Sequence, residues 1–249
     1  IAGSPAGLWL VTPAVALGAA VLVGGLEGPR LRERFGAPIG APWFGLPLAG
    51  AARPGLAHRA SAALTAFGPW VLLAALFAEL PALPGVPELR LPGEAGLPHV
   101  AAAGWLSVSA CALALLASFA AASGTQLRRF VRGAGLLTGL GFLLMLTLPG
   151  RVDGLAAELS PAGRSLAALQ QTFGADWMAF PSFAAAWAVF GATLLASAWP
   201  RLRLAWWGWA LAASVAGVFA GTQAVVGVLA GMALGLLGAW HEEGWRALV

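Results

Sequence analysis

Residues 204–240 read LAWWGWALAASVAGVFAGTQAVVGVLAGMALGLLGAW and contain no charged side chain. A helix needs roughly 20 apolar residues to cross about 30 Å of hydrocarbon. The stretch is therefore too long for one crossing and long enough for two, with the tryptophans at its start counted as membrane interface. The turn between the two crossings is expected at Gly221-Thr222-Gln223.

The composition of the whole chain is typical of a membrane protein. Of 249 residues, 59% are hydrophobic and 10% are charged, with a mean hydropathy of +0.82, whereas soluble domains carry about 25% charged residues. The net charge of +4 is small and unevenly placed, so it argues against nucleic-acid binding. Cys111 lies in an apolar run and is interpreted as a small core residue. We therefore expect an all-α integral membrane protein.

Five further spans are predicted outward from this hairpin, at 8–26, 60–78, 100–123, 133–149 and 179–199. Gly68-Pro69 predicts a kink in the second of them. Because residue 1 is isoleucine, we expect the natural chain to begin upstream, and the first apolar run is interpreted as a mature span rather than a signal peptide. Two regions are expected: 1–99, two spans with an interfacial loop, and 100–249, a helical bundle.

The arginines predict the orientation of these seven spans. Eleven of the fourteen fall in the connections after the first, third and fifth spans and at the C-terminus, and three fall on the other face, namely Arg90, Arg151 and Arg164. Loops that are rich in arginine stay in the cytoplasm. We expect a protein of a plasma membrane, most simply a bacterial one, with its N-terminus outside and its C-terminus inside. The polar segment 150–178 and the 221–223 turn are then extracytoplasmic.

Two motifs, at the two ends of residues 180–235, carry a family resemblance. Residues 180–188 read FPSFAAAWA, and residues 228–235 read VLAGMALG. The first resembles FPSLHxAWA, the second motif of the type 2 phosphatidic acid phosphatase superfamily in the branch that contains inositol phosphotransferases. The second resembles VLAGxxLG, which follows that superfamily's third motif, SRxxxxxHxxxD. Residues 146–151 lie where the first, basic motif is expected, and the resemblance extends over about residues 100–240.

The resemblance implies a bundle built from the last five or so spans and a chemistry that this chain lacks. In the family, the third-motif His attacks phosphorus with an Asp beside it, and the second-motif His protonates the leaving group. Basic side chains hold the phosphate oxygens. Here Ala184 replaces the acid His, Gln223 the nucleophile and Gly227 its Asp. Ala216 and Gly217 fall at the Ser-Arg pair.

What remains is a vestigial pocket without catalytic residues. It comprises Arg151, Arg164, Pro181, Ser182, Ala184, Gly217, Thr222, Gln223 and Gly227. Two simpler interpretations stay open: both arginines are solvated loop residues paired with Asp153 or Glu158, and Gln223 makes a helix-start hydrogen bond within its turn. Gly231 and Gly235 continue the four-residue spacing of Gly227, which predicts a stripe for close helix packing.

Two functions in different classes follow. The first is an inactive lipid-phosphatase-like protein that is a structural or accessory subunit of a membrane complex, with membrane lipids and other membrane-protein subunits as partners. The second is an active lipid phosphatase or phospho-head-group transferase with a rearranged site. The pattern predicts no cofactor and no metal. A retinal protein needs a lysine, which the chain lacks, and haem needs a histidine within a span, whereas His58, His99 and His241 lie at span ends or in loops.

Overall fold

The computed structural model describes residues 54–78, 85–98, 100, 103–152 and 179–248. The described chain is helical, as predicted. Its helices are α2 (Leu56–Ala78), α3 (Ala103–Val108), α4 (Ala110–Ala120), α5 (Gly124–Thr147), α7 (Phe183–Ala198), α8 (Arg203–Phe219) and α9 (Val225–Leu248), with 3-10 turns η2 (Glu94–Gly96) and η4 (Pro200–Leu202). The predicted first span and the segment that contains Arg164 lie outside the described residues.

Four helical stretches are long and apolar enough to cross a membrane: His58–Leu76, Ala103–Ala120, Gly124–Thr147 and Pro200–Phe219. Two shorter apolar helices, Phe183–Ala198 and Val225–His241, pack among them. Length and composition therefore indicate an integral membrane protein.

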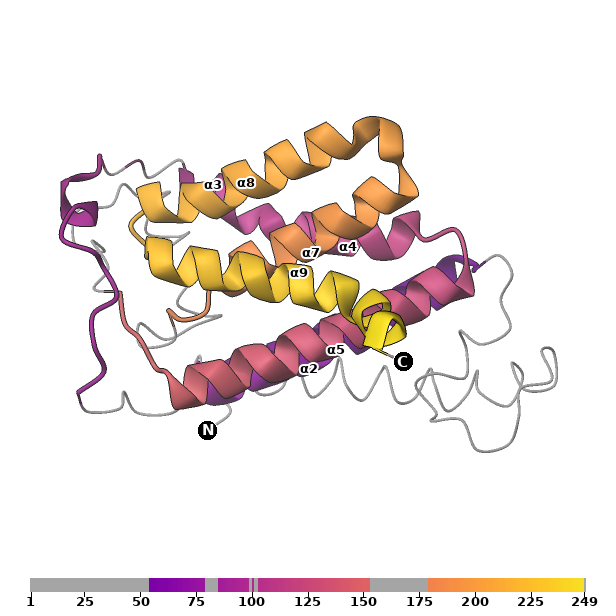
Figure 1. Cartoon of the computed structure of the whole chain (residues 1–249), viewed down its shortest axis with the longest axis horizontal. Helices are drawn as coiled ribbons and strands as arrows, with labels where there is room; N and C mark the ends of the chain where they lie inside the picture. The colour runs from indigo at the N-terminus through magenta and orange to yellow at the C-terminus, as the bar shows by residue number, and fades with distance from the viewer. Residues whose placement is uncertain (1–53, 79–84, 99, 101–102, 153–178, 249) are drawn as a thin grey trace, which may run out of the picture.

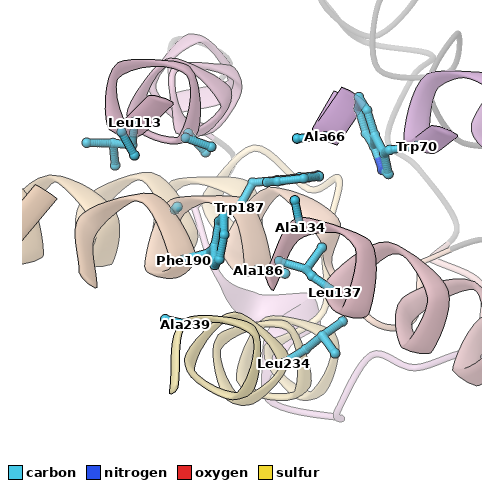
Figure 2. Close-up of a cluster of buried hydrophobic side chains, with 14 of the residues drawn as sticks. Ala66, Trp70, Leu113, Ala134, Leu137, Ala186, Trp187, Phe190, Leu234 and Ala239 are labelled. Atoms are coloured by element: carbon cyan, nitrogen blue, oxygen red, sulfur yellow. The ribbon is translucent and has the colours of Figure 1, made fainter. Parts of the chain in front are cut away.

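Helix α7 is the centre of the bundle. It packs against α4, α8 and α9, and α9 in turn packs against α5. Trp187 of α7 is fully buried, with the ring of Phe67 stacked on it at 4.5 Å and Phe190 edge-on at 5.9 Å. Figure 2 shows side chains of α2, α4, α5 and α9 gathered around Trp187 and Phe190. The alanine-rich sequence of α7 permits this central position because small side chains let neighbouring backbones approach on every side.

Helix α2 belongs to the same core. It packs against α5 and α4, and Trp70 lies edge-on to Trp187 at a ring distance of 6.2 Å. The helix runs through Pro69, where the sequence predicted a kink. The predicted division at residue 99 stays a prediction, but the core continues across that boundary.

The prediction of where the fourth span starts was wrong. Helix α5 begins at Gly124 rather than at 133, so Arg128, Arg129 and Arg132 lie in its first turns and not in a connection. Ser123 caps the helix, and its side chain accepts a hydrogen bond from the Gln126 amide at 3.2 Å. The cap stabilises the start of α5 because it pairs a backbone N–H that has no partner within the helix. Long arginine side chains can reach water from the end of a membrane helix.

Three other predicted spans also differ from the helices of the structure. The 100–123 span is two helices, α3 and α4, which meet at Ser109, and α4 ends at Ala120. The predicted 179–199 span is the shorter α7, which begins after Ser182. Helix α9 continues through the polar tail to Leu248 instead of ending near residue 240. The turn predicted at Gly221-Thr222-Gln223 is confirmed, with Gly221 at a φ of 70°.

The bundle has two chemically different ends (Figure 1). At one end, called the Gln223 end, α7 and α9 begin and α5 and α8 finish, beside residues 85–98. At the other, called the arginine end, α2, α5 and α8 begin. The arginine end contains Arg59, Arg128, Arg129, Arg132, Arg201 and Arg203.

Candidate functional site

Ser182 and Gln223 are joined directly at the Gln223 end. The Ser182 hydroxyl donates a hydrogen bond to Gln223 Oε1 at 2.8 Å, and Ser182 Oγ accepts one from the Ala185 amide at 3.1 Å. Ser182 therefore caps α7 and ties it to the segment that precedes α9. The partner of the Gln223 side chain thus lies at the start of another helix. The backbone N–H of Gln223 donates within its own turn, to the Gly217 carbonyl at 3.2 Å.

Gly217 shapes the space around Gln223. A β-carbon at position 217 would lie 2.6 Å from Gln223 Cδ, so the glycine leaves room for the amide. The Gly217 carbonyl accepts from the Thr222 amide and the Thr222 hydroxyl, both at 3.1 Å. The turn is consequently closed by its own polar groups.

The glycine stripe of α9 lies against the start of α7. A β-carbon at Gly227 would lie 2.8 Å from the Ala179 carbonyl oxygen. Added β-carbons at Gly231 and Gly235 would overlap the carbonyl oxygens of Ser182 and Ala186. The Ser182 amide also donates to the Gly227 carbonyl at 2.9 Å. The absence of side chains on this stripe lets the two helix backbones come into contact.

Arg90 and Glu94 complete the site, and sequence reasoning did not find either as a site residue. Arg90 donates to the Gly221 carbonyl at 2.7 Å. Both carboxylate oxygens of Glu94 accept from the Val225 amide, at 3.3 and 3.2 Å, so this acid lies at the first turn of α9. A carboxylate at the start of a helix is stabilised by the helix dipole. Each contact spans 131 residues of sequence, and no local motif signals such a pair.

The other predicted pocket residues lie around this cluster. Arg151 is exposed, and its backbone is bridged to the 87–89 segment through the Leu89 amide at 2.9 Å and the Pro87 carbonyl at 3.0 Å. Pro181 is buried. Ala184 is half-buried and packs against the hydrophobic core. The structure thus brings Ser182, Thr222, Gln223, Gly217 and Gly227 together, with Arg151 at the rim.

The chemistry open to this cluster is limited. Ser182 is the hydroxyl best placed to act as a nucleophile, but its proton is donated to an amide oxygen, which is not a usable base near neutral pH. Of the described histidines, His58 lies in the first turn of α2 and His241 lies near the end of α9, both away from the Gln223 end. Within the described ranges no group of three or more His, Cys, Asp or Glu side chains could hold a metal ion. The arrangement is suited to holding helices together.

Comparison with known proteins finds no matching family model, no matching curated protein and no matching solved structure.

Proposed function

We propose that this chain is a catalytically inactive, lipid-phosphatase-like membrane protein that acts as a structural or accessory subunit of a membrane complex. In this proposal the Gln223 end faces the outside of a bacterial plasma membrane and the arginine end faces the cytoplasm. The first span at 8–26 and the six helical segments described above together make the seven crossings.

The observation that carries the proposal is a set of hydrogen bonds that polar groups at the Gln223 end make within the chain. The hydroxyl of Ser182 donates to the side-chain oxygen of Gln223. The Gly221 carbonyl is bonded to Arg90, and the Val225 amide is bonded to Glu94. An enzyme of phosphate chemistry needs unpaired donors that point at the position of the phosphate.

Electrostatics supports the same conclusion. Phosphate commonly binds at the start of a helix, where free N–H groups and the helix dipole favour an anion. At α9 that position is taken by the Glu94 carboxylate, and at α7 the capping oxygen is that of Ser182. A phosphate would have to displace a carboxylate that is covalently part of the chain and would be repelled by it at short range.

The test is an assay of the purified full chain on phosphatidic acid, prenyl diphosphate and phosphatidylinositol donors, beside the Gln223→Ala variant. We expect no turnover in either protein. Turnover by the wild type that disappears in Gln223→Ala would replace the proposal with an active enzyme that has a rearranged site. The accessory role is tested separately by extraction in a mild detergent, where the chain should migrate in stoichiometric complex with other membrane subunits. Migration as a bare monomer would contradict that role.

A further inference from the structure

Three of the six arginines at the arginine end donate hydrogen bonds to groups of the protein itself. Arg59 donates to the Phe119 carbonyl, and Arg129 donates to the Ala239 carbonyl through Nε at 3.1 Å and a terminal nitrogen at 2.7 Å. Arg128 donates to the Thr125 hydroxyl at 3.4 Å. These side chains bind groups of the protein itself and connect neighbouring helices or turns.

Arg201 and Arg203 are different. Both are exposed and lie two residues apart in the α7–α8 turn, residues 199–204, with Arg201 in η4 and Arg203 as the first residue of α8. Among the residues that the structure describes, neither guanidinium has a hydrogen-bond or ion-pair partner, and the first turn of α8 contains no acidic residue. Within the described part of the chain, the turn therefore presents two positive charges that no acidic side chain pairs with.

Large apolar side chains alternate with these charges. Trp199, Leu202 and Leu204 are exposed by 42%, 50% and 78%. The Trp199 ring packs beside Trp206 at 5.9 Å, and Trp206 packs beside Trp209 at 6.5 Å. Trp209 is held in place because its indole N–H donates to the Ser109 hydroxyl at 2.8 Å. Exposed tryptophan beside arginine at the end of apolar helices is typical of the membrane–water boundary.

We propose that the α7–α8 turn, residues 199–204, binds the phosphate groups of anionic phospholipids in the leaflet at the arginine end. The two leucines and Trp199 enter the acyl region, which places both guanidinium groups at the depth of the lipid phosphates. A guanidinium group matches a phosphate because its planar donors bind two oxygens at once. The arginine end lies across the bundle from Gln223, so lipid binding there is independent of the function proposed above.

The test titrates the purified full chain, in a neutral detergent, with phosphatidylglycerol and counts the retained lipid by native mass spectrometry. Phosphatidylcholine with the same acyl chains is the comparison lipid, because its zwitterionic headgroup has no net charge, and inorganic phosphate tests whether the free anion suffices. We expect the Arg201→Gln/Arg203→Gln variant to bind phosphatidylglycerol about 30-fold more weakly, which corresponds to about 1 kcal/mol for each arginine. The Arg201→Lys/Arg203→Lys variant keeps the charge and should lose much less.

Arg128→Gln/Arg132→Gln is the matched control, because it removes the same charge from the same end of the bundle. It should leave phosphatidylglycerol binding nearly unchanged. Equal losses in both Gln variants, unchanged binding in Arg201→Gln/Arg203→Gln, or inorganic phosphate that competes as well as the lipid would each overturn the proposal. Added NaCl must also weaken phosphatidylglycerol retention by the wild type. Retention that is insensitive to salt would refute the proposal even if the double variant did not fold.

Discussion

The Gln223 side chain occupies the space that a side chain at Gly217 would need, since a β-carbon there would lie 2.6 Å from Gln223 Cδ and 2.7 Å from Oε1. The two positions are therefore coupled. The Gln223 side-chain oxygen is held in this space by the hydrogen bond that it accepts from the Ser182 hydroxyl.

This coupling predicts a non-additive pair of substitutions. Gly217→Ala should push the side-chain amide of Gln223 away from Ser182. The free energy of unfolding should fall by about 1 kcal/mol, the net contribution of one hydrogen bond. Gln223→Ala removes the same hydrogen bond and makes room, so Gly217→Ala should add little in that background. Thermal unfolding of the two single variants and the double variant in detergent measures the coupling. Additive losses would mean that the two side chains do not compete for this space.

The contact between α7 and α9 predicts a strong effect at Gly231. A β-carbon at Gly231 would overlap the carbonyl oxygen of Ser182, which is helix-cap backbone and cannot move aside. Gly231→Ala should therefore destabilise the protein by about 1–3 kcal/mol, and Gly231→Leu should prevent folding. Gly135→Ala on α5 is the matched control, because a β-carbon there meets nothing within 4 Å in the described structure. If both alanine variants melt at the same temperature, the α7–α9 contact is looser than described.

The Glu94 carboxylate at the start of α9 predicts that removing its charge lowers the stability of the protein. Glu94→Gln keeps the size of the side chain but removes the charge that faces the helix dipole and the Val225 amide. We expect the free energy of unfolding to fall by about 0.5–1 kcal/mol at low ionic strength, and the difference from the wild type to be smaller in high salt. Glu88→Gln is the control, because Glu88 is exposed and takes part in the β-bridge through its backbone. Loss of the same size in both variants would leave Glu94 without a special role.

The arginine asymmetry predicts which end faces the cytoplasm. Single cysteines in a Cys111→Ala background test this orientation, because a reporter fused after Arg132 would interrupt α5. Ala122→Cys lies in the exposed turn between α4 and α5, at the arginine end, and Gly93→Cys lies in the exposed segment at the Gln223 end. In intact cells an impermeant thiol reagent should label Gly93→Cys and should not reach Ala122→Cys. Labelling in the reverse order would invert the proposed orientation.

The sequence predicted the positions of most of the described membrane spans and of the turn between the last two. The uncharged 204–240 stretch predicted two helices with a turn at Gly221-Thr222-Gln223, and the structure has that turn. The apolar runs located α2, α7 and α8 to within a few residues at most ends. The reason is physical: a membrane span must be long and apolar whatever it packs against, so composition alone identifies it.

Only the tertiary structure decided how the polar groups are paired. The start of α5 at Gly124 is capped by Ser123, and the arginines that the sequence predicts in the connection before this span lie in its first turns. The partners of Gly221 and Val225, Arg90 and Glu94, come from 131 residues away. A buried amide or a helix start needs some partner, but the sequence does not say which one. Packing of α7 against α9 brings Ser182 to Gln223, and their hydrogen bond joins the start of α7 to the segment before α9.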